Sequence, residues 1–135
     1  MDFLPALDAP IDKKKAVLMN TLVLAYVGDA VQSLYVRTKL SLTDGHKSGA
    51  LHSKAIGEVS AKAQSAMVEE LEKLFNQEES DVYRRAKNSK PHSVAKHAEA
   101  EEYHRATGLE AVLGYLYLTG QTDRLNVLLN YVKEN

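Results

Sequence analysis

Two acidic residues in two strongly apolar segments are the features of this sequence that could do chemistry. Asp29 is the only carboxylate between Leu22 and Val36, and Glu110 is the only one between Leu109 and Leu118. An ionised carboxylate inside an apolar helix is unfavourable unless it is paired, hydrogen-bonded or bound to a metal. Two such acids on separate core helices suggest a shared site for Mg²⁺ or Mn²⁺. The alternative is that each acid lies at the edge of its helix and contacts solvent or a nearby base.

A basic segment follows an acidic one in the middle of the chain. Acids predominate from Glu69 to Asp81, whereas the stretch from Arg84 to Lys96 contains none. Such a patch can bind polyanions although the formal net charge of the whole chain is −1. Beside a divalent ion it suggests phosphodiester chemistry, in which the ion activates a water and stabilises charge at phosphorus. The basic side chains would then bind the flanking phosphates. The alternative is that the basic segment is a solvent-exposed helix end without a ligand.

Other kinds of site have less support. His97, Glu101 and His104 are spaced i, i+4 and i+7 on one predicted helix face, which is compatible with zinc, but no fourth ligand is evident. The chain has no cysteine, which excludes disulfides and thiolate metal sites. It also has no Gly-rich phosphate loop and no nucleophile elbow.

The hydrophobic pattern predicts an all-α fold. No run alternates β-branched and polar residues over five positions. The first core helix would be capped by Asn20 or Thr21, and because it is apolar on all sides we expect it to belong to the core and also to be able to serve a subunit interface. Gly28 within it suggests close approach of a neighbouring backbone or of substrate. A loop at residues 41–45 is expected, and then helices at about 46–56, 59–75, 78–88, 95–118 and from 122 onward.

Length and composition predict one domain of 135 residues, with an N-terminal lead at residues 1–17. The first residues do not resemble a signal peptide, and the apolar run around Asp29 is too short for a membrane span. The lack of cysteine fits a reducing compartment. We therefore expect a cytoplasmic protein without a membrane partner.

The two acid-bearing helices resemble those of the ribonuclease III catalytic domain. The run from Leu24 to Val31 looks like its signature helix, and the run from Thr107 to Leu118 looks like its second carboxylate-bearing helix. Further matches lie at residues 51–54, 59–64 and 84–90. No double-stranded-RNA-binding domain follows in this chain, so the resemblance is to Mini-ribonuclease III, the short bacterial branch of the family.

The resemblance implies an endoribonuclease that cleaves double-stranded RNA with Mg²⁺, for which Mn²⁺ would substitute, and leaves 5′-phosphate and 3′-hydroxyl ends. It implies a dimeric helical bundle, a homodimer with a valley for RNA, in which Asp29 and Glu110 are the catalytic and metal-binding acids. The implied substrate is the paired ends of 23S precursor ribosomal RNA, and an accessory ribosomal protein is left open. The RNA-binding candidates are Lys54, Lys62, Arg84, Arg85, Lys87, Asn88 and Lys90.

The sequence departs from full-length ribonuclease III at three positions around the site. Leu22, Ala25 and Thr107 stand where that enzyme carries further acids. Water or RNA phosphate would have to complete the metal shell. A catalytically inactive RNA-binding or ribosome-associated scaffold with the same fold is the alternative, but the two retained acids argue against it. An unrelated helical interaction module would not explain the basic segment.

Overall fold

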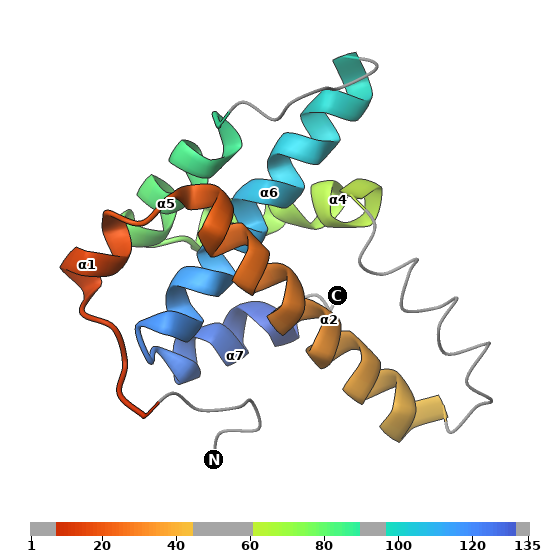
Figure 1. Ribbon diagram of the computed structural model, residues 1–135. Helices are drawn as coiled ribbons and strands as arrows, with labels where there is room; N and C mark the ends of the chain where they lie inside the picture. Colours follow the sequence, from red (N-terminus) through yellow and green to blue (C-terminus); the bar gives the residue numbers. More distant parts are fainter. Residues whose placement is uncertain (1–7, 45–60, 90–96, 132–135) are drawn as a thin grey trace.

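The computed structural model describes residues 8–44, 61–89 and 97–131, and every regular element in these ranges is helical. This confirms the predicted all-α class. Figure 1 shows the arrangement. The elements are α1 (Lys13–Val17), α2 (Thr21–Asp44), α4 (Ala61–Leu71), the short 3₁₀ helix η1 (Glu72–Leu74), α5 (Gln77–Lys87), α6 (His97–Leu118) and α7 (Thr122–Tyr131).

Helix α6 is the centre of the fold. It contacts α1, α2, α4, α5 and α7, and α2 crosses over it with the largest interface of the molecule (Figure 1). The C-terminal part of α6 is buried on nearly all sides, with Leu113, Tyr115 and Leu116 at 2% exposure or less. A helix with apolar residues all round its axis is stable only when other elements surround it. The sequence of α6 therefore fixes its central place.

Local signals at the helix ends explain where the elements begin and stop. Asn20 caps α2 by accepting a hydrogen bond from the Leu22 amide at 2.8 Å. Asn76 and Glu79 form a reciprocal capping box at the start of α5. After α6, Gly120 adopts a φ of +72°, which lets the chain turn directly into α7. The starts of α2 and α5 and the end of α6 lie within one residue of the predicted boundaries.

Two predicted boundaries are wrong. Helix α2 extends to Asp44, so residues 41–44 are helical rather than a loop; Ser41 Oγ donates to the Arg37 carbonyl oxygen, and no Gly or Pro lies between Gly28 and Gly45. The predicted helix at 59–75 ends earlier, since α4 stops at Leu71 and Phe75 is extended. The helix expected at 46–56 lies outside the described residues.

Helix α2 belongs to the core on one face only. Its inner face, with Leu24, Ala25 and Val31, is buried against the bundle, but Val23 and Tyr26 are exposed. The reason is geometric: α2 crosses the outside of the bundle and contacts α6 along one side (Figure 1). Its apolar outer face is therefore uncovered in the single chain.

The described part of the N-terminal lead, residues 8–17, packs onto the bundle through α1. Ala16 is fully buried, the Ile11 amide donates to the Leu118 carbonyl oxygen at 2.8 Å, and Arg85 Nη1 donates to the Val17 carbonyl oxygen at 3.0 Å. These contacts join the start of the chain to α5 and α6. Within the described ranges, no helix is long and apolar enough to cross a membrane.

Candidate active site

Two glycines bring the backbones of α2 and α6 into direct contact. A Cβ added to Gly28 would overlap the Glu110 carbonyl oxygen, and one added to Gly114 would overlap the Leu24 carbonyl oxygen. These two contacts pair residue 24 with residue 114 and residue 28 with residue 110, so the helices run antiparallel at the crossing. The close approach of a neighbouring backbone that was expected at Gly28 is confirmed.

This crossing places the segments that carry the two predicted acids side by side. Glu110 forms the backbone contact on α6, and Asp29 immediately follows the contacting residue Gly28 on α2. Asp29 is exposed and Glu110 is half-buried, so the expectation of an acid inside the core is wrong for Asp29. The acids lie at the rim of the crossing, where a solvent-borne ligand can reach them.

The donors at this crossing suit a hard divalent cation. Within the described ranges no group of three or more His, Asp, Glu or Cys residues is arranged to hold a metal. The two carboxylates therefore lack a third acidic or histidine ligand there. Mg²⁺ tolerates such a site, because it prefers oxygen ligands and usually keeps several waters while one or two carboxylates bind it.

Two buried polar side chains lie one helical turn from the acids. Gln32 is three residues after Asp29 and is 5% exposed, and its Oε1 atom has no hydrogen-bond partner among the described residues. Thr107 is three residues before Glu110 and is 6% exposed. Sequence reasoning missed Gln32. The available signal was an amide side chain four residues after Gly28, on the helix face that the glycine marks as contacting a neighbour.

Three of the basic residues predicted to bind RNA lie at the C-terminal end of α5, and each has a partner within the protein. Arg85 donates to the Val17 carbonyl oxygen, and Lys87 pairs with Glu101 at 3.7 Å. Arg84 is largely exposed and pairs with Asp81 one turn earlier at 3.2 Å. Such exposed pairs contribute little and are easily exchanged for another anion.

The structure describes the remaining RNA-binding candidates only in part. Asn88 is exposed at the C-cap of α5. Lys62 lies on α4, but its side chain is not described, and Lys54 and Lys90 lie outside the described residues.

The end of α5 touches the start of α2, since Thr21 Oγ1 and Ser89 Oγ are 2.8 Å apart. Thr21 precedes Asp29 by eight residues, about 12 Å along the helix.

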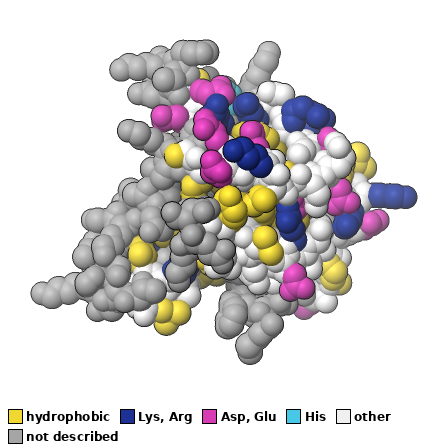
Figure 2. Space-filling view, turned by 180° about the vertical axis from the view of Figure 1, so that it is seen from behind, with side chains coloured by type: hydrophobic (Ala, Val, Ile, Leu, Met, Phe, Trp, Pro, Cys, Tyr) yellow, Lys and Arg dark blue, Asp and Glu magenta, His cyan; other side chains and the backbone are white. Residues whose placement is uncertain are grey.

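An ion-pair network joins α4, α5 and α6. Arg105 lies 3.0 Å from Glu69 and 3.3 Å from Glu101, and Glu101 also pairs with Lys87. These partners occupy Glu101, the central residue of the suggested zinc face. Figure 2 shows acidic and basic side chains intermixed around hydrophobic ones on the side opposite the view of Figure 1. No single sign of charge dominates the described side chains on that side.

Tyr83 fixes α5 against α6 next to this network. A Cβ on Gly108 would lie 2.6 Å from two atoms of the Tyr83 ring, so the ring rests directly on the α6 backbone. Burial raises the pKa of Tyr83 well above its usual range. The contact holds α5 close to the turn of α6 that precedes Glu110.

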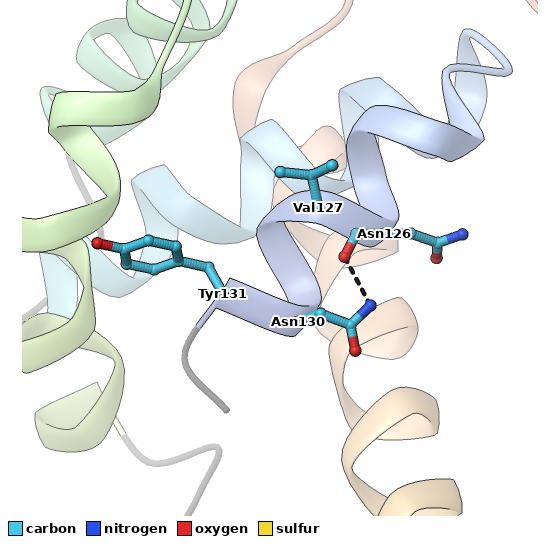
Figure 3. A pocket seen from close by; sticks show the side chains of 4 residues that line it. All are labelled: Asn126, Val127, Asn130 and Tyr131. Atoms are coloured by element: carbon cyan, nitrogen blue, oxygen red, sulfur yellow. Dashed lines mark hydrogen bonds between the residues drawn. The ribbon is translucent and has the colours of Figure 1, made fainter. Parts of the chain in front are cut away.

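A shallow hollow on α7 contains none of the predicted site residues. It is lined by Asn126, Val127, Asn130 and Tyr131, and Figure 3 shows the Asn130 side chain donating to the Asn126 carbonyl oxygen. The Tyr35 hydroxyl of α2 donates to Asn130 Oδ1. The hollow has two amides and no acid or base in its lining, so it offers no catalytic group.

Comparisons with known proteins agree on one family. The ribonuclease III domain family matches residues 22–121. A Mini-ribonuclease 3 of Thermoanaerobacter sp. (strain X514) is 41% identical over 119 residues, covering 88% of this chain and 84% of the relative. One of Clostridium tetani is 43% identical over 115 residues, covering 84% and 76%. A crystal structure of protein FN1578 from Fusobacterium nucleatum matches with a TM-score of 0.75 and 31% identity, covering 87% of this chain and 93% of that one.

Proposed function

The chain belongs to the ribonuclease III family and is an endoribonuclease of double-stranded RNA, and from that premise we propose which of its residues do the work. Enzymes of this family generally use a divalent metal ion. We propose that the ion is Mg²⁺, replaceable by Mn²⁺, and that Asp29 and Glu110 hold it. The observation that carries this proposal is the backbone contact of Gly28 with Glu110, which sets the acids at one solvent-accessible crossing.

The position of the acids supports their role in hydrolysis. When bound, a divalent ion supplies an activated water and stabilises the charge that develops at phosphorus. Asp29 and Glu110 project from two helices whose backbones touch, so the Cα atoms from which the two acids project are held at a fixed separation. Rigid placement of this kind is what a catalytic constellation needs. The expected products carry 5′-phosphate and 3′-hydroxyl ends.

We propose that the end of α5 grips the RNA backbone. A-form RNA is recognised mainly through phosphates and 2′-hydroxyls. Exposed basic and amide side chains at one end of a protein helix are therefore suitable contacts. Arg84 and Asn88 are exposed there. Arg85 and Lys87 are also candidates, and RNA phosphates would compete with their internal partners. Lys54, Lys62 and Lys90 remain candidates from the sequence.

The RNA grip is tested by the salt dependence of binding. Each lost phosphate contact should lower the slope of log affinity against log salt by about one. Arg84→Gln and Lys87→Gln should therefore weaken binding to an RNA duplex and flatten its salt dependence. Arg85→Gln should do the same and also lower stability, because Arg85 Nη1 ties α5 to the Val17 carbonyl oxygen. An unchanged slope in all three variants would refute this role of the α5 end.

The proposed physiological substrate is the paired ends of 23S precursor ribosomal RNA, and the proposed compartment is the cytoplasm. The resemblance to Mini-ribonuclease III supports both. The enzyme would act as a homodimer, and the exposed apolar face of α2, with Val23 and Tyr26, supports that assembly. An accessory ribosomal protein would be a further partner of the RNA complex.

A cleavage assay tests the assignment of the acids. Purified protein is incubated with an RNA duplex and Mg²⁺, and wild type is compared with Asp29→Asn and Glu110→Gln. Each substitution keeps the side-chain size and removes the charge, so cleavage should fall by at least about a thousandfold with the fold unchanged by circular dichroism. Glu70→Gln, which changes an exposed acid of α4, is the matched control and should cleave normally. Full cleavage by Asp29→Asn would disprove the site.

A further inference from the structure

Gln32 is the buried polar group of α2 that the packing of the chain leaves unexplained. The described residues contain four buried polar or charged side chains, Thr21, Gln32, Glu79 and Thr107. Thr21 contacts Ser89, and Glu79 binds Arg124 and the Asn76 amide. Gln32 Oε1 has no hydrogen-bond partner among the described residues. Orphaned buried acceptors are rare, and a bound water, an ion or a functional role commonly explains them.

The position of Gln32 connects it to the acid pair. It lies four residues after Gly28, and so on the face of α2 that contacts α6. It also lies three residues after Asp29, a spacing that puts Cβ atoms about 5–6 Å apart on a helix surface. Because the two helices run antiparallel, the turn of α6 opposite Gln32 is the one before Glu110. That turn carries the buried Thr107.

The site needs acceptors of this kind because it has few acids. Asp29 and Glu110 supply two carboxylates, and within the described ranges no third acid or histidine joins a metal-binding group. A divalent ion held by two carboxylates keeps several waters. Groups that accept hydrogen bonds from those waters orient them, and loss of such an outer partner typically weakens metal affinity 10- to 100-fold.

We propose that Gln32 is a positioning residue of the carboxylate site, whose amide oxygen accepts a hydrogen bond from a water in the coordination shell of the divalent ion. This inference rests on the proposed function, since the ion is the one assigned to Asp29 and Glu110. It explains why an amide occupies a buried position in an otherwise apolar stretch of α2. It also gives the site an acceptor that compensates for the missing acids at Ala25 and Thr107.

The test compares metal affinity with stability in Gln32→Leu. Leucine keeps much of the buried volume but cannot accept a hydrogen bond. Mn²⁺ binding to the RNA-free protein, measured by electron paramagnetic resonance, should weaken about tenfold. The Tm in EDTA should stay the same or rise, because the substitution removes an orphaned buried acceptor. Wild-type Mn²⁺ affinity in Gln32→Leu would overturn the proposal.

Two further variants keep the test decisive. Gln32→Glu retains an acceptor and should bind Mn²⁺ at least as tightly as wild type, which separates hydrogen bonding from shape. Gln32→Met, unbranched and without an acceptor, replaces Gln32→Leu if the leucine variant does not fold, with the same expected loss. If Gln32→Glu loses affinity as Gln32→Leu does, the acceptor role is wrong.

A control separates this role from general loss of polar groups in α2. Thr21→Val removes a buried hydroxyl two turns before Asp29, together with its contact to Ser89. Its Tm should fall while its Mn²⁺ affinity stays at the wild-type value. Failure of this inference is distinct from failure of the proposed function. If Asp29→Asn abolishes cleavage and Mn²⁺ binding but Gln32→Leu changes neither, only the role of Gln32 is refuted.

Discussion

Tyr115 lies in the centre of the core, and its hydroxyl reaches the first turn of α5. Its side chain is fully buried, and the hydroxyl donates to Glu78 Oε2 at 3.1 Å. Burial, and then the hydrogen bond to Glu78, raise the pKa of Tyr115 to about 12. In the unfolded chain the pKa of a tyrosine is about 10. The folded state therefore holds the phenolic proton to a higher pH than the unfolded state does.

This shift predicts a loss of stability at high pH. The unfolded state releases the phenolic proton first, so the contribution is complete below about pH 10 and is lost as the pH rises toward about 12. Between pH 9 and pH 11, Tyr115 should lower the free energy of unfolding by about 1 kcal/mol. Urea unfolding of wild type and Tyr115→Phe measures this as a difference in pH dependence. Tyr103→Phe, at an exposed position on α6, is the control. Identical pH dependence in wild type and Tyr115→Phe would contradict the prediction.

At the level of single residues, the sequence suggested which side chains could form a site, but it did not predict how exposed they are or what they contact. Two lone acids in apolar runs led to the prediction that Asp29 and Glu110 share a site; the backbone contact of Gly28 with Glu110 is compatible with that pairing, which stays a prediction. The exposure of Asp29 could not be predicted, because it depends on which side of α2 faces the bundle. The internal bond of Arg85 to Val17 was equally invisible, since 68 residues separate the partners.

The crossing of α2 and α6 depends on two glycines, and a single methyl group should disrupt it. In Gly28→Ala the new Cβ would overlap the Glu110 carbonyl oxygen and lie 2.9 Å from the Gly114 nitrogen. Backbone atoms cannot rotate away, so the helices would have to separate. We expect a loss of about 3 kcal/mol or more, well above the gain of about 1 kcal/mol from replacing a helical glycine.

Gly108→Ala is the comparison for this prediction. Its Cβ would meet the ring of Tyr83, a side chain that can shift, rather than a backbone. The free energy of unfolding from urea titration should therefore fall less in Gly108→Ala than in Gly28→Ala. Because Gly28 adjoins Asp29, cleavage should also be lost in Gly28→Ala at temperatures where the variant is folded. A stable, active Gly28→Ala enzyme would show that the helices do not touch as described.

A buried ion pair joins α5 to α7. Glu79 is fully buried, and its two oxygens accept from Arg124 at 2.7 and 2.8 Å. Arg124 also donates to the Leu74 carbonyl oxygen. The hydrogen bond from Arg124 to Glu79 raises the pKa of the guanidinium. One side chain thus ties α7 to the end of η1 and to the start of α5.

Removing one partner of this pair should cost more stability than removing both. Arg124→Met leaves the Glu79 carboxylate buried without its cation, a situation that typically costs about 3–5 kcal/mol. Adding Glu79→Leu removes that uncompensated charge, so the double variant should recover part of the loss. Urea unfolding of the two single variants and the double variant gives the coupling energy. A double variant less stable than Arg124→Met would show that the charge is not the cause.

Helices were predictable from the sequence to the extent that local signals set them. The N-cap residues Asn20 and Asn76 begin α2 and α5, and Gly120 follows the end of α6, each within one residue of the boundary expected from the sequence. The C-terminal part of α2 was not predicted, because Ser41 is a turn-former by type yet bonds back to the Arg37 carbonyl oxygen within the helix. Periodicity identified helices, but the choice of which face packs inward came from the bundle.

On the scale of the whole molecule, one large surface of α2 is not covered by the chain itself. Four exposed apolar residues lie on one side of this helix: Leu22, Val23, Tyr26 and Leu34. Tyr26 follows the first two by four and three residues, and Leu34 follows Tyr26 by eight. Tyr26 is 80% exposed, three residues before Asp29. A contiguous apolar strip of this kind on a folded chain marks an interaction surface. In a two-fold dimer the same strip meets itself, so one helix would build the interface and the site.

If the exposed apolar strip of α2 forms the interface of the proposed homodimer, a charge at Tyr26 should separate the two protomers. Wild type should sediment at twice the chain mass of 14.9 kDa, and Tyr26→Lys should sediment at the chain mass, because two lysines would face each other across the two-fold axis. Tyr103→Lys, at an exposed position on α6, is the matched control and should remain a dimer. If both variants sediment as wild type does, the α2 strip is not the interface. If Tyr26→Lys is monomeric and folded, its cleavage of long RNA duplexes should fall sharply, since a valley built from two protomers requires both.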